Sequence, residues 1–384
     1  MSFEDSAEYI AKAKNLFTIG AAFTTNTSKG HDFFDINTHT LAALNTRTTG
    51  YSFLDKSLNG GYSNKTLVVL MGGPKTGKSM WLCNLAAQSV KNGYNTLYIT
   101  LELPYQKVSQ RIGANMFNIP IAQYNETVND NNLFNKKVQE FRVNQLGKLG
   151  TFILEEFPTS TATAEMIEAF AIKKQEEISA LTGKDFKFDN VYIDYLNIMR
   201  DMKNPNSENT YLKIKSICED VRAMAQRNEW CVISVTQTNR GGTESSDLNM
   251  TDVSESAGLT ATVDALFGII RTTMMRAEGC YYLKAVAMRD SPLMGCKKRY
   301  TFNDTYLRLS EDLTEEIIAD GVDIPSIYVS ATANGVAKYQ QNNRGYNKQV
   351  PQQPVPIQQG TPLIQTPQLG ISESQLTGAD LFKM

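Results

Sequence analysis

Short apolar runs alternate with longer amphipathic stretches between about residues 50 and 310. Because parallel strands are joined by helical crossovers, this alternation predicts an α/β fold with a mostly parallel central sheet flanked by helices. The expected strands are Thr66–Leu70, Thr96–Thr100, Thr151–Leu154, Asn190–Asp194, Cys231–Thr236, Ala265–Arg271 and Tyr281–Met288. The expected helices are Met80–Asn92, Ala164–Ile178 and Tyr211–Arg227, and a final hairpin joins Lys298–Phe302 to Tyr306–Leu309.

Both ends of the chain differ from this central region. Residues 4–17 carry apolar side chains on one face, which predicts a short helix that packs on its own domain or, in an oligomer, on a neighbouring subunit. Residues 333–384 are rich in Gln, Asn, Pro and Gly, which predicts a flexible, disordered tail. Its apolar end is either a peptide for a partner or a frayed terminus. We therefore expect an N-terminal helix and linker at 1–45, an ATPase domain at 46–332 and the tail.

Composition narrows the class of protein. The chain has 384 residues, of which 41% are hydrophobic and 20% charged, as in soluble globular proteins. No apolar run is long enough to span a bilayer, and the first residues lack a signal-peptide pattern, so we expect a cytoplasmic protein without membrane contact. A net charge of −2 argues against bulk electrostatic binding of nucleic acid, but it permits a local basic channel.

The cysteines and histidines point away from disulfide and metal chemistry. The 5 cysteines are scattered without C-x-x-C pairing and lie mostly in apolar segments, so we expect buried, reduced thiols. His31 and His39 lie in a polar stretch without metal-ligand spacing. Neither histidine is a good catalytic candidate.

The segment after the first expected strand has the chemistry of a phosphate-binding loop. It fits G-x-x-x-x-G-K-[ST] with Gly72, Gly73, Pro74, Lys75, Thr76, Gly77, Lys78 and Ser79. Glycines allow successive backbone N–H groups to point at phosphate oxygens, and the following helix start adds its dipole. Lys78 would reach the β- and γ-phosphates, and the Ser79 hydroxyl would ligate Mg²⁺. We therefore predict ATP and Mg²⁺ as ligands.

Two carboxylates follow expected strands. Asp194 ends Asn190–Asp194 and would hold Mg²⁺ opposite Ser79, although strand-terminal Asp residues are also common in turns. Glu102 lies between leucines after Thr96–Thr100, where an ionised Glu is unusual. It would polarise the water that attacks the γ-phosphate, or it is simply a residue at a helix start.

Further polar residues follow other strands. Gln237 could sense the γ-phosphate, because a neutral amide can bind both phosphate and the attacking water. Arg200, Lys203 and the polar stretch to Asn209 leave the same sheet edge as the loop that begins at Arg240, so in a ring the two loops could converge on a channel. Arg289 is either an arginine that stabilises a transferred phosphoryl group in a neighbouring subunit or a surface residue that closes a strand.

With these residues in place, Arg47–Leu309 resembles the ATPase domain of the DnaB-type hexameric replicative helicases, and within them the T-even phage members. The resemblance rests on the phosphate-binding loop and on the following stretches: Thr49-Gly50-Tyr51, Leu97-Tyr98-Ile99, Ile193-Asp194-Tyr195-Leu196, Ser207-Glu208-Asn209, Ser245-Ser246-Asp247-Leu248-Asn249-Met250 and Glu255-Ser256-Ala257-Gly258-Leu259.

The resemblance implies a RecA-like P-loop NTPase that forms a homohexamer, encircles single-stranded DNA and moves 5′→3′ at a replication fork. It implies that Lys78, Ser79, Asp194 and Glu102 are catalytic, that Gln237 is the sensor and that Arg289 acts in trans. It also implies primase, a helicase loader and single-strand-binding protein as partners. The implied DNA-facing residues are Arg200, Lys203, Asn204, Arg240, Gly241, Ser254, Glu255 and Gly258.

Two positions depart from the family pattern. Many members carry a lysine two residues before the trans-acting arginine, where this chain has Ala287, with Lys284 as the nearest basic residue. Residues 1–45 are too few for the helical N-terminal domain that usually engages primase. Two other functions stay open: a RecA-like recombinase that forms filaments on DNA, and a nucleotide-dependent replication scaffold without unwinding.

Overall fold

The computed structural model of the chain describes residues 33–35, 45–145, 147–204, 207, 209–237, 257–289, 291 and 293–319. All of them belong to one compact unit, Met1–Ala331, and none to the second unit, Thr332–Met384. The predicted N-terminal helix at 4–17 and the predicted disordered tail therefore lie outside the described residues.

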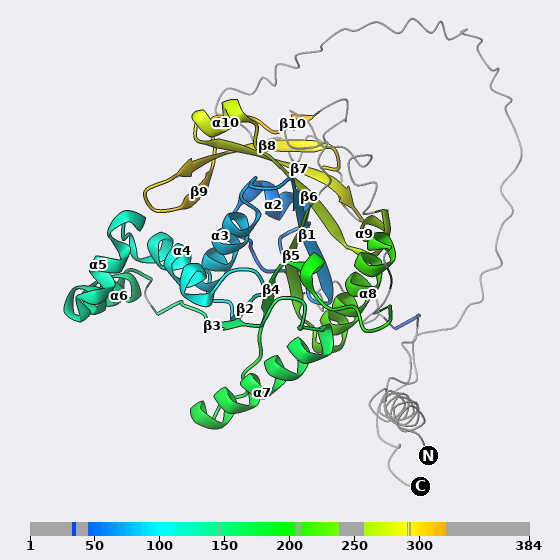
Figure 1. Ribbon diagram of the computed structural model, residues 1–384, viewed down its shortest axis with the longest axis horizontal. Helices are drawn as coiled ribbons and strands as arrows, with labels where there is room; N and C mark the ends of the chain where they lie inside the picture. Colours follow the sequence, from blue (N-terminus) through cyan, green and yellow to red (C-terminus); the bar gives the residue numbers. More distant parts are fainter. Residues whose placement is uncertain are drawn as a thin grey trace, which may run out of the picture. The chain divides into compact units, whose positions relative to one another are not determined.

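A single sheet of ten strands organises the described part of the chain (Figure 1). Its strand order is β10-β8-β7-β6-β1-β5-β4-β2-β3, and β9 pairs with β8. The strands are β1 (Thr66–Gly72), β2 (Thr96–Thr100), β3 (Phe152–Glu156), β4 (Asn190–Asp194), β5 (Cys231–Gln237), β6 (Ala265–Ile270), β7 (Cys280–Met288), β8 (Cys296–Asn303), β9 (Arg308–Glu311) and β10 (Ile318–Ala319).

The predicted α/β architecture is confirmed, with one qualification about strand direction. The strands β1 to β6 pair in parallel, as the alternation of strands and helices indicates. From β6 onward every pairing is antiparallel. Only the 5-residue helix α10 (Thr273–Ala277) lies between β6 and β7, which is too short for a parallel crossover.

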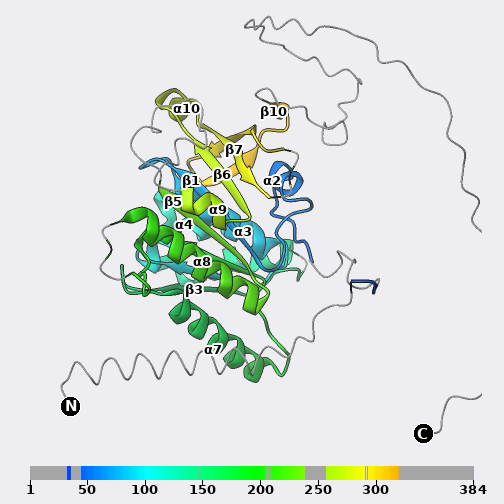
Figure 2. The ribbon, with the colours of Figure 1, turned by 90° about the vertical axis from the view of Figure 1, so that its right-hand side faces the viewer.

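Helices cover both faces of the parallel strands. The alternation along β1 decides which face each side chain enters: Val68 and Leu70 pack with α3 (Lys78–Lys91), whereas Leu67 and Val69 pack with the helices α7 (Ala164–Thr182) and α8 (Thr210–Asn228). Figures 1 and 2 show α3 and α8 on opposite sides of β1 and β5. Both faces of β1 are therefore buried, and its carboxyl end is fixed from both sides.

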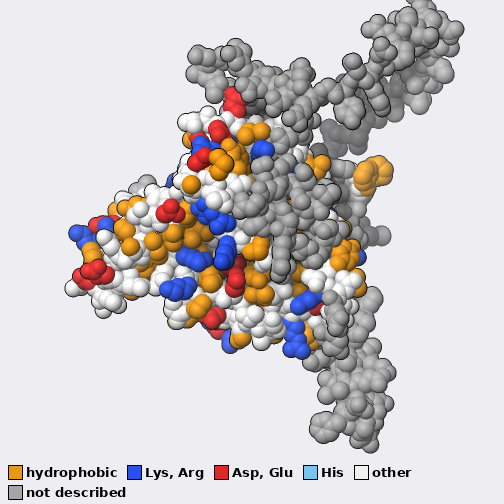
Figure 3. All heavy atoms as spheres, turned by 45° about the horizontal axis from the view of Figure 1, so that its top comes forward, with side chains coloured by type: hydrophobic (Ala, Val, Ile, Leu, Met, Phe, Trp, Pro, Cys, Tyr) orange, Lys and Arg blue, Asp and Glu red, His pale blue; other side chains and the backbone are white. Residues whose placement is uncertain are grey.

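Helices between β2 and β3 form an arm that the sequence pattern did not reveal. They are α4 (Tyr105–Phe117), α5 (Tyr124–Asn129) and α6 (Asn131–Asn144), with the short 3₁₀ helix Ile121–Gln123 before α5. In Figure 1 this arm projects beyond the β3 edge of the sheet. Figure 3 shows hydrophobic side chains exposed along it, and the exposed apolar residues there include Leu133 and Val143.

The remaining described helices are short connections around the sheet. They are α2 (Ser52–Ser57), the 3₁₀ helix Leu196–Ile198 after β4, and α9 (Ala257–Thr262) directly before β6. None of the described helices is long and apolar enough to cross a lipid bilayer.

The prediction of buried, reduced cysteines is confirmed. All 5 cysteines of the chain are free and buried. Burial raises the pKa of the Cys83 and Cys218 thiols to about 12. These side chains therefore pack as small apolar groups and stay protonated at neutral pH.

Candidate functional site: the carboxyl edge of the parallel strands

The phosphate-binding loop joins the end of β1 to the start of α3. Gly72 is the last residue of β1, and Lys78 is the first residue of α3. Between them the backbone turns through two residues with positive φ, Lys75 at 60° and Gly77 at 93°. The Thr76 hydroxyl closes the loop by donating a hydrogen bond to the Gly73 carbonyl at 2.8 Å. The loop thus delivers the first turn of α3, with its free N–H groups, to the carboxyl edge of the sheet.

The Lys78 ammonium lies over this loop. Its Nζ donates to the carbonyl oxygens of Gly72 at 3.2 Å and Gly73 at 2.9 Å. Burial lowers the pKa of Lys78, while the negative charges of Glu102 and Asp194 act in the opposite direction. The cation is therefore held at the loop by carbonyl groups that phosphate oxygens could replace.

Ser79 and Asp194 meet across the gap between α3 and β4. The Ser79 hydroxyl donates to Asp194 Oδ1 at 3.2 Å, and the Tyr98 hydroxyl donates to Asp194 Oδ2 at 3.3 Å. Asp194 is completely buried, and this burial raises its pKa to about 6 even though both hydroxyl hydrogen bonds oppose the shift. A buried carboxyl with only hydroxyl partners gains stability from a nearby cation.

The side chains at this point fit Mg²⁺. A carboxylate oxygen and a hydroxyl oxygen are hard ligands of the kind that Mg²⁺ prefers, and the ion takes its other ligands from phosphates and water. Within the described residues, no group of three or more His, Cys, Asp and Glu side chains could hold a metal ion. Binding of Mg²⁺ at Ser79 and Asp194 would therefore depend on a nucleotide.

Glu102 lies in an exposed turn at the same end of the sheet. The sequence pattern placed its carboxylate among apolar neighbours, but the side chain is exposed in the turn after β2. Leu101 is buried, whereas Glu102 is exposed, because Glu102 lies beyond the end of β2, where the sheet and its helices no longer cover the chain. Glu102 is nevertheless close to the other site residues, because its negative charge acts to raise the pKa of both Lys78 and Asp194.

Gln237 is the last residue of β5 and lies directly beside the phosphate-binding loop. Its register partner on β1 is Gly72. The Asn197 amide oxygen fixes this strand end by accepting hydrogen bonds from the Thr236 hydroxyl at 2.8 Å and from the Gln237 N–H at 3.3 Å. The Gln237 side chain is exposed at the edge where Lys78 and Asp194 also lie.

Arg289 lies near the amino ends of the parallel strands, whereas the phosphate-binding loop lies at their carboxyl ends. Met288 pairs with Ala265, which in turn pairs with Val68 near the start of β1. Gly72 is four residues further along β1, or roughly 13 Å at the usual rise of a strand. The chain therefore does not bring Arg289 to its own candidate nucleotide site.

The loop after β4 carries three of the predicted DNA-facing residues. Arg200 is exposed, Lys203 forms an ion pair with Asp220 of α8, and the Asn204 amide donates to Asp201 at 3.0 Å. Because β4 and β5 are parallel, this loop and the segment after Gln237 leave the same edge of the sheet. Gly258 lies in α9. The other predicted DNA-facing residues, Arg240, Gly241, Ser254 and Glu255, lie outside the described residues.

Two arginines near the loop were not apparent from the sequence pattern. Arg271 follows β6, and its guanidinium lies 4.1 Å from the centre of the Tyr281 ring. Arg276 of α10 donates to the Lys75 carbonyl at 3.2 Å. These residues approach the loop only because β6 pairs with β1. The two strands are about 200 residues apart in the sequence, and no local motif indicates that they pair.

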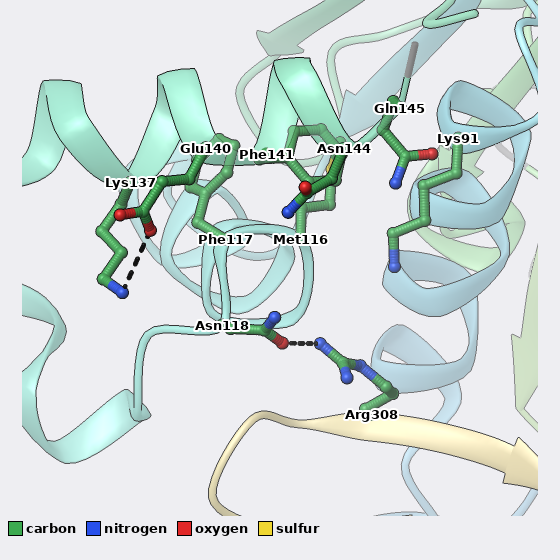
Figure 4. A pocket seen from close by; sticks show the side chains of 10 residues that line it. All are labelled: Lys91, Met116, Phe117, Asn118, Lys137, Glu140, Phe141, Asn144, Gln145 and Arg308. Atoms are coloured by element: carbon green, nitrogen blue, oxygen red, sulfur yellow. Dashed lines mark hydrogen bonds and ion pairs between the residues drawn. The ribbon is translucent and has the colours of Figure 1, made fainter.

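A cavity of about 310 Å³ lies away from this edge, between α3, α4, α6 and β9 (Figure 4). Lys91 Nζ donates to Asn115 Oδ1 at 2.9 Å, and Arg308 donates to the Asn115 carbonyl and to Asn118 Oδ1. Burial, with the nearby charge of Arg308, lowers the pKa of Lys91 to about 8. Because these cations bind the carboxyl end of α4, where helix carbonyls are free, the cavity has a structural explanation.

The fold and the loop together define the class of protein: a P-loop protein with a RecA-like α/β fold. The family model described as "DnaB-like helicase C terminal domain" matches residues 47–299, and the chain belongs to this family.

Individual relatives agree with this assignment. The DnaB-like replicative helicase of Enterobacteria phage T4 is 30% identical over 269 residues, covering 68% of this chain and 54% of the relative. The replicative DNA helicase DnaB of Rickettsia conorii is 23% identical over 270 residues, covering 67% and 49%. The chain thus spans about half the length of these relatives.

Two solved structures share the fold. One, described as an ATPase domain, superposes with a TM-score of 0.57 at 16% identity, covering 77% of this chain and 97% of that one. A DnaB-like replicative helicase, described together with its interactions with primase, superposes with a TM-score of 0.59 at 17% identity, covering 79% and 73%. At these identities the likeness concerns the fold.

Proposed function

We propose that this chain is an ATP-dependent replicative DNA helicase that moves 5′→3′ along single-stranded DNA as a ring of six copies. The observation that carries the proposal is the gathering of Lys78, Asp194, Gln237 and the loop after β4 at one edge of the sheet. Membership of the DnaB-like helicase family supports it. A change in bound nucleotide at this edge would be felt directly by the loops that leave it.

Each residue of the edge has a distinct role in this proposal. Lys78 binds the β- and γ-phosphates, and Ser79 with Asp194 holds Mg²⁺, which neutralises charge on the phosphates when bound. Glu102 polarises the attacking water, and its exposure allows a water molecule to reach it. Gln237 contacts the γ-phosphate and transmits its loss to the segment that follows β5.

Arg289 is proposed to act on the nucleotide of a neighbouring copy. Its side chain is 44% exposed and lies near the amino ends of the parallel strands. It is therefore accessible to another subunit and distant from the phosphate-binding loop of its own chain. A guanidinium placed there would stabilise charge on the transferred phosphoryl group. Hydrolysis would then require a ring. Many family members carry a lysine two residues before this arginine, and because Ala287 stands there in this chain, Arg289 would act without that second cation.

We also propose a surface for the docking of neighbouring copies. A cavity of about 610 Å³ lies between α4, α6 and the segment before β3, and its walls include Ile112, Val138 and Leu149. The apolar face predicted for residues 4–17 of a second copy is proposed to pack against this wall. Ile10→Asp should abolish rings while nucleotide binding persists, and Lys12→Asp should preserve both. Rings that survive Ile10→Asp would contradict the assignment.

Primase, a helicase loader and single-strand-binding protein are proposed as partners at the fork. The solved DnaB-like helicase whose description names primase supports the first of these. The tail at 333–384 is proposed as a flexible tether for such contacts.

The decisive experiment measures ATP turnover with and without single-stranded DNA. It also compares strand displacement from two DNA substrates, one with a 5′ loading tail and one with a 3′ loading tail. The proposal requires stimulation by DNA, displacement with the 5′ loading tail and rings by electron microscopy with a non-hydrolysable ATP analogue. Stimulated turnover with filaments and no displacement would favour a recombinase instead. Absence of turnover would favour a scaffold.

A further inference from the structure

One face of α8 contacts the loop after β4. Ser216 donates its hydroxyl hydrogen to Asp201 Oδ1 at 2.9 Å, and Asp220, one helical turn later, forms the ion pair with Lys203. Residues four apart lie on the same side of a helix, so this face of α8 is occupied by the loop.

Asp201 makes the attachment rigid. Its side chain is only 3% exposed, and its Oδ1 also accepts the backbone N–H groups of Lys203 at 2.9 Å and Asn204 at 3.2 Å. These hydrogen bonds lower the pKa of Asp201 despite the opposing effect of burial, which keeps the carboxylate ionised. A displacement of the loop therefore pulls on α8.

A second face of α8 reaches Arg289. Arg222, about 200° around the helix from Asp220, donates two hydrogen bonds to Asp264, from Nε at 3.2 Å and Nη2 at 3.0 Å. Asp264 in turn lies 3.5 Å from Arg289 Nε and accepts the Leu67 N–H at 2.9 Å. One carboxylate thus joins α8, the start of β1 and Arg289.

The guanidinium of Arg289 also lies on the carboxyl end of α9. It donates to the carbonyl oxygens of Ala261, Thr262 and Val263 at 3.3 to 3.4 Å. In sequence α9 overlaps the end of the second predicted DNA-facing segment, Arg240–Gly258. Arg289 is therefore attached to structures that continue into both segments.

We infer that α8 couples the DNA-facing loop to the trans-acting arginine, with Asp264 as the residue that positions Arg289. This inference rests on the proposed function, because it assigns a regulator to the same site. Buried Ile217, Val221 and Met224 line the side of α8 that packs on the sheet, so a movement of the helix would displace Asp220 and Arg222 together. When DNA moves the loop, α8 carries that movement to Asp264 and changes how Arg289 meets the neighbouring nucleotide.

The test uses Arg222→Gln in the full chain, with Arg227→Gln as the matched control. Arg227 lies on the same helix and donates two hydrogen bonds to a carboxylate, Glu168, at 3.0 and 2.6 Å, but that carboxylate belongs to α7. Arg222→Gln should keep the wild-type Kd for single-stranded DNA, KM for ATP and basal turnover within about twofold. It should lower DNA-stimulated kcat at least fivefold, whereas Arg227→Gln should leave stimulation intact.

Asp220→Asn tests the other end of α8. Loss of the ion pair should strengthen binding of single-stranded DNA, because Lys203 no longer needs to leave Asp220, and it should weaken the stimulation of ATP turnover. An exposed ion pair of this kind limits the gain in affinity to about fivefold.

The outcomes separate the inference from the proposed function. Wild-type protein without any DNA stimulation would end the proposed function itself. Given wild-type stimulation, full stimulation in Arg222→Gln would overturn the coupling by α8. An equal loss of basal and stimulated turnover in Arg222→Gln would overturn it as well, since that result indicates a purely structural ion pair.

Discussion

The Tyr281 hydroxyl oxygen lies where a side chain on Gly77 would begin, 2.6 Å from the Cβ position of that residue. Gly77 also has a φ of 93°, which L side chains rarely adopt. Two independent constraints thus require glycine immediately before Lys78: the close approach of β7 and the left-handed backbone of the loop itself.

Gly77→Ala should therefore abolish nucleotide binding, because relief of the contact and the backbone strain both displace Lys78 and the start of α3. Gly183→Ala is the matched control: its φ is 68°, but nothing lies within 4 Å of its Cβ position, so it should cost only about 1 kcal/mol of stability. Equilibrium binding of a fluorescent ATP analogue and Tm report on both. In Gly77→Ala, the further change Tyr281→Phe should restore part of the binding, since it removes the colliding oxygen.

Lys78→Ala should lower ATP turnover more than 100-fold while Tm stays near the wild-type value, because the ammonium contacts only loop carbonyls in the absence of phosphate. Turnover and thermal melting give the two readings. Lys107→Ala, at an exposed position of α4, serves as the control and should match wild type. A Lys78→Ala protein with normal turnover would mean that the loop is not the catalytic site.

Asp194→Asn should stabilise the nucleotide-free protein in a pH-dependent way. The folded-state pKa of about 6 is higher than the ordinary value of 3.8, so between these values the unfolded chain ionises first and folding becomes less favourable as pH rises. Removing the carboxyl should raise stability by up to about 3 kcal/mol at pH 8 and by about half as much at pH 5. Denaturant titrations of both proteins across this range provide the measurement, and a gain independent of pH would refute the buried carboxyl as its source.

Arg289→Ala should leave nucleotide binding nearly normal, because this residue lies away from the nucleotide site of its own chain. It should stop hydrolysis, because the nucleotide site of the neighbouring copy loses the arginine that acts on it. Mixing it with Lys78→Ala protein should restore some turnover, since some interfaces in mixed rings combine an intact loop with an intact arginine. Turnover of the mixture at defined ratios measures this complementation. If no ratio restores activity, Arg289 does not act across an interface.

The sequence predicted the parallel strands well because burial on both faces produces recognisable apolar runs. The boundaries of β2 and β4 matched the prediction, and those of α8 differed by one residue at each end. The arm from α4 to α6 was missed. In α4, Val108, Ile112 and Met116 recur at helical spacing and join the main core, so a signal was present there. In α6 only Phe141 is buried, so that helix has little apolar pattern to read.

The candidate site was predictable where one local motif determines it. The phosphate-binding loop and the strand-terminal Asp194 fall in this class, and the structure brings Ser79 and Asp194 together. The exposure of Glu102 could not be predicted, because it depends on which way a turn residue faces. The positions of Arg271 and Arg276 depend on strand pairing across most of the chain, for which a single sequence contains no signal.

The burial of every cysteine gives the native chain a chemically silent background. A maleimide dye added to the folded protein should find no reactive thiolate, so a single cysteine introduced at an exposed position such as Met202 would be the sole attachment point. Fluorescence from that label could then follow the loop after β4 through each turnover, without any prior replacement of native residues.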